Sequence, residues 1–180
     1  MQNRILIVIT VAIYLLSSCS AGGTRAAMLN STDDGRNTDN KLAQIVDAMN
    51  NRDKEALKAL FSEQALEEAE SLDDNIDYLF DFIQDDIESW ERSGGPAIYE
   101  VVHYGQNTKE SKTIYNVYTK ENEYLLFLLE YTIDTAHAEN VGLFMLQIIK
   151  AEDRNSYFDW GIDTRCAGVY RPDESDINVP

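Results

Sequence analysis

The hydrophobic pattern of the chain changes its period once, at the Gly-Gly-Pro turn of residues 94–96. Before this turn, apolar residues recur at intervals of three and four, which is the spacing of one face of a helix. After it, segments rich in β-branched and aromatic residues alternate with short polar turns, which indicates antiparallel strands. Helices followed by strands predict an α+β domain.

Three helices are expected before the turn. The first begins near Thr38 or Asp39, and the second follows Asp53, which is expected to be its N-cap. The third is expected to run from Ser71 to Trp90, because Ser71 with an acidic residue three positions later is typical of a capping box. The Gly-Gly-Pro turn would then end this helix.

Strands are expected over residues 97–104, 111–119, 123–133 and 141–151, with a short fifth piece over 157–160. The third strand is apolar on both faces, because Leu126 and Leu128 alternate with Leu125, Phe127 and Leu129. Strands of a sheet with one solvent-exposed face should alternate apolar and polar residues, so the second face of this sheet is expected to be covered. The candidates are the C-terminal tail and a second subunit. The tail, residues 171–180, is polar, which favours a homodimer through the outer sheet face.

The N-terminus combines one basic residue, Arg4, with an apolar run over residues 5–16. This length suits a signal peptide and is shorter than the roughly 20 residues of a spanning helix. The sequence Leu16-Ser17-Ser18-Cys19 resembles a bacterial lipobox. The resemblance implies that residues 1–18 are removed and that Cys19 receives a diacylglyceryl group, which anchors the chain to a membrane outside the cytoplasm. A simple secretory signal and an uncleaved anchor are the alternatives.

The segment from the cysteine to residue 40 is small and polar and has no periodicity, so it is expected to be a flexible tether. The chain carries 32 acidic and 15 basic residues, a formal charge of −17. This charge excludes nucleic acid as a partner, because phosphate binding requires Lys and Arg. Anionic headgroups would also repel it, so membrane attachment is expected to depend on the lipid.

The chain has two cysteines. If Cys19 is acylated, Cys166 has no partner for a disulfide within the chain and is expected to be buried near the last strand. No zinc-type spacing, phosphate loop, dinucleotide fingerprint or nucleophile elbow occurs, so no metal or cofactor is predicted.

Two stretches resemble known families. Residues 42–61 are similar to the opening helix pair of the nuclear-transport-factor-two-like superfamily. Residues 71–77, Trp90 and residues 141–143 resemble an uncharacterised bacterial lipoprotein family, domain of unknown function 5104. The resemblance covers roughly residues 40–152.

The superfamily resemblance implies a cone, in which three helices pack on a strongly curved antiparallel sheet of four to five strands. The single domain would occupy residues 41–170. A pocket often opens between the long helix and the concave face in such folds. Members include isomerases, dehydratases and non-enzymatic binding modules, so the fold does not determine the function.

An isomerase or dehydratase of this fold would need an acid or base inside the cone, where apolar surroundings raise the pKa of a carboxylic acid. Glu130 is the candidate, with Tyr115 or His103 as a second proton carrier. A plainer interpretation is that Glu130 lies near a strand end and reaches water. A non-catalytic protein would instead use an aromatic pocket, for which the candidates are Tyr78, Phe82, Trp90, Tyr115 and Tyr131. Such aromatic residues also fill ordinary cores.

Two polar features have structural explanations. Asp134 and His137 share one loop and could form a hydrogen bond there. An aspartate also recurs every fourth position along the third helix, at Asp73, Asp77, Asp81 and Asp85, which predicts a solvated helix face. Because no catalytic motif is present, we expect non-catalytic binding of a small ligand or a protein partner, with an isomerase or dehydratase as the alternative.

Overall fold

The computed structural model describes the backbone of residues 21–172 and the side chains of residues 33–172. The predicted signal peptide, Cys19 and most of the predicted C-terminal tail therefore lie outside the described residues. The chain divides into two compact units, residues 1–37 and 38–180. Among the described residues, no helix is both long and apolar enough to cross a bilayer.

Helix α2 (Ala21–Asn50) begins well before the predicted start near Thr38. Residues 21–40 were predicted to be a tether without regular structure, and the structure shows them as helix. The stretch contains no proline that would interrupt a helix, but most of its residues, including three glycines, have low helix propensity, so local propensity does not explain this helix. In the second unit, the buried apolar residues of α2 are Leu42, Ile45, Ala48 and Met49.

The first two helices after α2 are short, and each has an N-cap hydrogen bond. The Asp53 carboxylate accepts a hydrogen bond from the Ala56 backbone N–H at 2.9 Å, as predicted. The Ser62 hydroxyl accepts one from the Ala65 N–H at 3.1 Å. The helices that follow are α3 (Lys54–Lys58), α4 (Glu63–Glu68) and α5 (Leu72–Phe82).

Helix α5 is shorter than the sequence predicts, and the predicted capping box is wrong. Ser71 adopts a left-handed conformation with φ 52° and makes no side-chain cap hydrogen bond. Ile87 and Trp90, predicted to be helical, belong to strand β1 (Ile87–His103). Asn50 accounts for this change, because its side chain donates to the Ile87 carbonyl at 3.1 Å and accepts from the Ile87 N–H at 2.8 Å.

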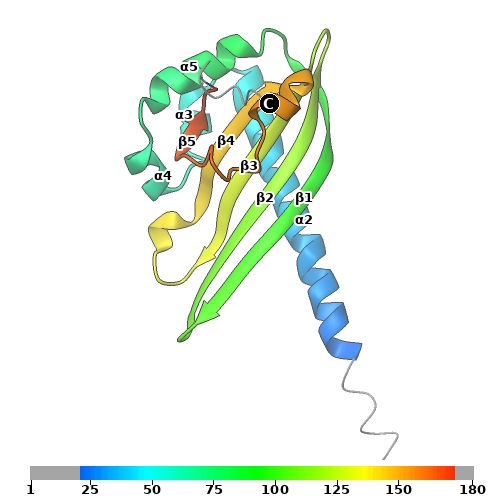
Figure 1. Cartoon of the computed structure of the whole chain (residues 1–180), viewed down its shortest axis with the longest axis vertical. Coiled ribbons are helices and arrows are strands. Elements are labelled where there is room, and N and C mark those ends of the chain that lie inside the picture. The colour runs from blue at the N-terminus through cyan, green and yellow to red at the C-terminus, as the bar shows by residue number, and fades with distance from the viewer. Residues whose placement is uncertain (1–20, 173–180) are drawn as a thin grey trace, which may run out of the picture. The chain divides into compact units, whose positions relative to one another are not determined.

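The sheet has five strands in the order β1-β2-β3-β4-β5 (Figure 1). The first four pair antiparallel, and β5 is parallel to β4. The α+β class is therefore confirmed, and the sheet is mixed instead of wholly antiparallel. The remaining strands are β2 (Gln106–Thr119), β3 (Glu123–Asp134), β4 (Gly142–Lys150) and β5 (Gly168–Tyr170).

The predicted fifth strand over residues 157–160 is wrong, since that stretch contains the end of helix α6 and an irregular loop. The loop is organised by Asp159, whose carboxylate accepts hydrogen bonds from the backbone N–H groups of Gly161, Asp163 and Thr164. An extended strand cannot direct the backbone N–H groups of three such closely spaced residues at one side chain. The remaining helices are η2 (Ala138–Asn140), η3 (Ala151–Asp153) and α6 (Arg154–Tyr157).

Strand β1 runs through the Gly-Gly-Pro sequence that was expected to end a helix. Its pairing with β2 shifts register on both sides of Gly94, so these residues form an irregularity within the strand. Pro96 is tolerated because β1 lies at the sheet edge. The hairpin to β2 closes through Tyr104 and Gly105, with φ values of 48° and 81°, as a two-residue turn with two positive φ angles requires.

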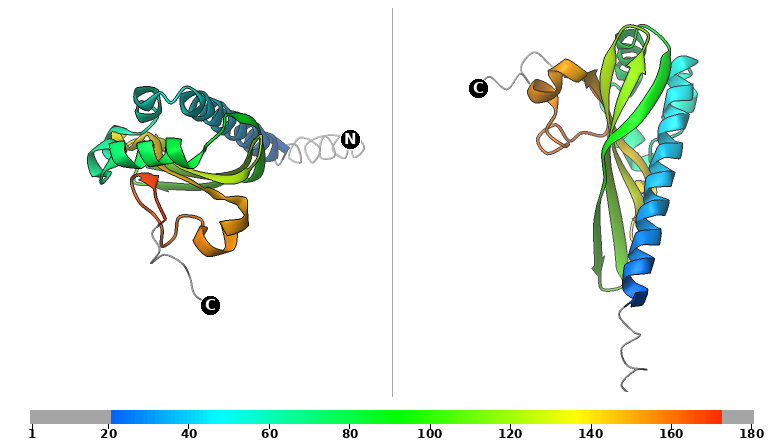
Figure 2. Two further views of the ribbon diagram at one scale, coloured as in Figure 1. Left: turned by 90° about the horizontal axis from the view of Figure 1, so that it is seen from above. Right: turned by 90° about the vertical axis from the view of Figure 1, so that its right-hand side faces the viewer.

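Both faces of β3 and β4 are buried, as the sequence predicts for β3. Figure 2 shows what lies over each face of the sheet. Helices lie on one face, and the chain after β4 lies on the other. The helix-side core includes Tyr115, Val117, Tyr124, Leu126, Leu128, Leu146 and Ile148. The core of the second face comprises Ile114, Leu125, Phe127, Leu129, Met145 and Ile149.

The second face is covered by residues 151–167, which we call the covering segment. Tyr157, Phe158 and Cys166 pack against the apolar residues of this face. The Phe158 ring meets Phe127 edge to face, with the ring centroids 5.5 Å apart. The cover therefore comes from the chain itself, upstream of the polar tail, and the reason for expecting a second subunit on this face no longer holds.

Candidate functional site

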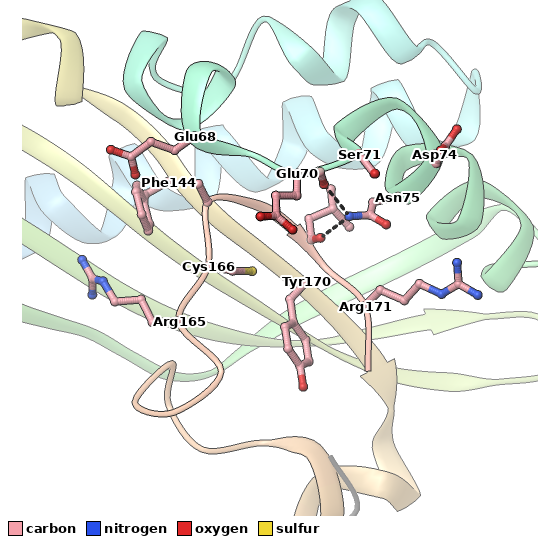
Figure 3. Close-up of a pocket in the computed structure, with 12 residues that line it drawn as sticks. Glu68, Glu70, Ser71, Asp74, Asn75, Phe144, Arg165, Cys166, Tyr170 and Arg171 are labelled. Carbon is pink, nitrogen blue, oxygen red and sulfur yellow. Dashed lines mark hydrogen bonds between the residues drawn. The ribbon is translucent and has the colours of Figure 1, made fainter. Parts of the chain in front are cut away.

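The largest of the cavities described here has a volume of about 820 Å³ and lies between the α4–α5 connection and the chain that enters β5 (Figure 3). The first wall is formed by Glu68, Glu70, Ser71, Asp74 and Asn75. The second wall is formed by Arg165, Cys166, Ala167, Val169, Tyr170 and Arg171, with Phe144 from β4.

The two walls are joined by Asn75 from the first turn of α5. Its side-chain amide donates to the Glu70 carbonyl at 3.2 Å and to the Val169 carbonyl at 3.3 Å (Figure 3). Gly168 permits the close approach of β5, since a Cβ atom there would lie 2.8 Å from the Cβ of Ala69. The cavity is therefore bordered by backbone that the fold holds in place.

The two arginines of the second wall are engaged with protein groups. Arg165 donates to a Glu110 carboxylate oxygen at 2.9 Å and to the Tyr131 hydroxyl at 2.6 Å. Arg171 lies over the Tyr78 ring, 4.5 Å from its centroid. Figure 3 shows the two guanidinium groups on opposite sides of Cys166.

Cys166 is half-buried at this cavity, in agreement with its predicted position near the last strand. Burial raises the pKa of its thiol to about 11. The thiol therefore stays protonated at neutral pH, and a protonated thiol is a poor nucleophile. Arg165, which could have favoured a thiolate, is paired with Glu110.

The predicted catalytic candidates lie in separate places. Glu130 is buried on the helix side, where one carboxylate oxygen accepts a hydrogen bond from the Thr38 hydroxyl at 3.2 Å. The interpretation that Glu130 reaches water is therefore wrong. His103 is exposed at the end of β1, with its ring 4.2 Å from that of Tyr104. Neither these two residues nor Tyr115 lines the large cavity.

Tyr115 belongs to a polar network that sequence reasoning missed. Its hydroxyl donates to Asp39 at 2.8 Å, and Asp39 also forms an ion pair with Arg92. Burial, followed by the hydrogen bond to Asp39, raises the pKa of Tyr115 well above its ordinary value. The phenol is therefore a poor proton donor at neutral pH.

The five predicted aromatic residues form three separate groups. Tyr78 and Phe82 stack with centroids 5.6 Å apart, and both line a smaller cavity of about 320 Å³. Trp90 meets Tyr115 edge to face in the helix-side core, with centroids 5.6 Å apart. Tyr131 meets Phe144 on the second face, with centroids 6.0 Å apart. The structure does not bring these residues into one pocket.

The loop that contains Asp134 and His137, and the row of aspartates on α5, both have local structural roles. The Asp134 carboxylate accepts hydrogen bonds from the backbone N–H groups of Ala136 and His137, so it shapes the loop after β3. The aspartate row on α5 is more than a solvated face. Three of its members form ion pairs with the chain around α3: Asp73 with Lys58, Asp77 with Lys54, and Asp81 with Arg52.

Comparison with known families adds one result. A family model described as a domain of unknown function (DUF5104) matches residues 44–151. The chain belongs to this family. The DUF5104 match includes the first wall of the large cavity, whereas residues 165–171 of the second wall lie beyond it. No curated protein matches the chain.

Proposed function

We propose that this DUF5104 protein is an exported lipoprotein that binds a small polar ligand without catalysis. A lipid on Cys19 would hold it at a membrane outside the cytoplasm. The cavity of about 820 Å³ between the α4–α5 connection and β5 carries the binding proposal. Its size lies within the range of roughly 300–1,000 Å³ that is usual for small-molecule sites.

The lining of the cavity favours a polar ligand. Glu68, Glu70 and Asp74 offer carboxylates, and Tyr170 offers a phenol, beside the apolar ring of Phe144. This combination can fix the orientation of a small molecule through a few polar contacts. The sequence analysis pointed to an aromatic pocket, whereas this cavity has several charged side chains in its lining, which support a more polar ligand.

The alternative of an isomerase or dehydratase receives support from the burial of Glu130 on the helix side. Catalysis would require a second group within hydrogen-bond reach of the same substrate. Tyr115 is bonded to Asp39, and His103 is on the hairpin of β1, so we favour binding. Membership of the nuclear-transport-factor-two-like superfamily, with its cone shape, is part of the same proposal and is supported by helices that precede a largely antiparallel sheet.

Blocking the cavity tests the binding proposal. Glu70 is exposed and lines the cavity, so Glu70→Trp should obstruct it without disturbing the core. Native mass spectrometry of the chain purified from its own host should show a small molecule on the natural chain. In Glu70→Trp we expect its occupancy to fall at least about tenfold, which corresponds to about 1.4 kcal/mol.

The matched control is Glu67→Trp, which makes the same change at an exposed position of α4 outside the cavity lining. This variant should keep the bound molecule. A natural chain that carries no small molecule, or equal loss in both variants, would refute binding at this cavity. A co-purified protein in place of a small molecule would favour a docking role.

Replacing the two cysteines one at a time tests the anchor. The natural chain should begin at Cys19, carry the mass of a diacylglyceryl group and partition into detergent, because two acyl chains suffice for stable attachment. Cys19→Ala should accumulate as an unprocessed precursor that retains residues 1–18. Cys166→Ala should be processed like the natural chain. Intact-mass analysis that finds an unmodified Cys19 in the natural chain would rule out the lipoprotein proposal.

A further inference from the structure

The last third of β1 exposes apolar side chains on both faces of the sheet. Tyr99 and Val101 point to one face and Ile98 and Val102 to the other, because side chains alternate along a strand. Their exposed fractions are 69% and 40% for the first pair, and 37% and 69% for the second. At the turn that follows, Tyr104 is 93% exposed. The large exposed apolar side chains of β1 all lie in this part of the strand.

The same stretch is an edge of the sheet. β1 pairs only with β2, and no described strand lies along its outer side. The backbone groups on that side are therefore a template for another strand, and natural edge strands usually carry charges that prevent such pairing. Residues 97–105 contain a single acidic residue, Glu100, and no Lys or Arg, in a chain whose formal charge is −17.

A second copy of the chain fits this edge. Two antiparallel β1 strands related by a two-fold axis at Val101 would place Val101 opposite its own copy. Tyr99 would then face His103 of the partner subunit, on the same side of the sheet. These pairs bring together β-branched and aromatic side chains, which stabilise neighbouring strands.

The charges are compatible with this register. Glu100 would face Val102 of the partner subunit, so no two like charges would lie directly opposite each other. The Glu100 carboxylate also accepts a hydrogen bond from Asn107 at 2.9 Å, and Lys109 lies opposite it on β2. Pairing in the plane of the sheet would give the exposed apolar side chains on both faces of β1 new neighbours. A partner that packed on one face would leave those on the other face exposed.

We infer that two copies of the chain associate by antiparallel pairing of their β1 edges, centred on Val101. The association joins the two five-stranded sheets into one continuous sheet. It does not depend on the proposed ligand, because none of the paired residues lines the large cavity. It also differs from a dimer through the outer sheet face, which the covering segment occupies.

Cysteine cross-linking of the full chain in its membrane tests the register. In a Cys166→Ser parent, Val101→Cys should form a covalent dimer on mild oxidation or with a short bismaleimide, since the two-fold axis brings the residue beside its copy. Glu88→Cys is the matched control, because it is exposed on the same strand but far from the axis. The Cys166→Ser parent, which retains Cys19, shows how much covalent dimer forms without an introduced cysteine.

A maleimide label first establishes that both introduced thiols are accessible. An accessible Val101→Cys that stays monomeric, or equal dimer formation by Glu88→Cys, would overturn the proposal. So would a cross-link from Val101→Cys to a different protein or to another segment of its own chain. As a second variant, Val101→Lys would place two ammonium groups opposite each other and should weaken association of the full chain in detergent at least about tenfold by sedimentation.

Discussion

Phe127→Ala is expected to lower the free energy of unfolding by about 3–5 kcal/mol, the usual cost of removing a buried aromatic side chain. Phe127 is fully buried on the second face of the sheet, against Phe158 of the covering segment. The backbone also approaches it closely, since a Cβ atom on Gly161 would lie 3.1 Å from its ring. Because small domains are stable by only about 5–15 kcal/mol, this loss would be a large fraction of the total.

Urea denaturation followed by tryptophan fluorescence measures this effect. The chain has two tryptophans, Trp90 on β1 and Trp160 in the covering segment. A Trp90→Phe background therefore reports on the covering segment alone. Ile162→Ala is the matched control, because this side chain is on the same segment and 71% exposed, and it should cost less than about 0.5 kcal/mol. A comparable small loss in Phe127→Ala would contradict the packing of the covering segment on the sheet.

Asp39→Ala is expected to cost about 1–3 kcal/mol, because it leaves the Tyr115 hydroxyl without its acceptor. It also removes the ion-pair partner of Arg92. The higher helix propensity of alanine offsets a few tenths of a kcal/mol. Asp47→Ala, at an exposed position of the same helix, is the control and should change stability by less than about 0.5 kcal/mol.

The Asp39 network also predicts a dependence on pH. Burial alone would raise the pKa of Asp39, but hydrogen bonds from Arg92 and Tyr115 outweigh it and hold the pKa below its ordinary value. A lowered pKa in the folded state means that this contribution is present above about pH 4 and is lost as the pH falls through the folded pKa. The free energy of unfolding, measured by urea denaturation at several pH values between 7 and 3, should therefore decrease less with falling pH in Asp39→Asn than in the natural chain. An equal decrease in both proteins would contradict the role of this carboxylate.

The second half of α2 and strands β2, β3 and β4 could be predicted because each has a clear hydrophobic period. The exception at the end of α5 is instructive. Ile83, Ile87 and Trp90 have helical spacing, but the chain turns into a strand at Ile87. The groups that hold it extended belong to Asn50, 37 positions earlier, and no local pattern contains that contact.

The covering segment could not be predicted from periodicity either. Tyr157 and Phe158 are adjacent residues in a polar stretch, and the loop that follows is shaped by hydrogen bonds to one carboxylate of Asp159. Because β3 is apolar on both faces, the sequence correctly predicted that the second face of the sheet is covered. It did not predict which residues cover that face, because residues 151–167 have no repeating pattern.

The candidate cavity was missed for a similar reason. Its walls come from residues 68–75 and 165–171, and they meet through Asn75 and the carbonyl of Val169, which are 94 positions apart. No motif connects the two stretches. Sequence reasoning did place Cys166 near the last strand, although it predicted a buried side chain and the structure shows a half-buried one. This residue is the one part of the second wall that the sequence located.

The covering segment has a consequence for how the family is delimited. The family match ends at residue 151, where the covering segment begins. A chain cut there would keep the four long strands but present Ile114, Leu125, Phe127 and Met145 to water. The region matched by the family model is therefore shorter than the region that folds with both faces of its sheet covered. The folding unit must extend at least through β5.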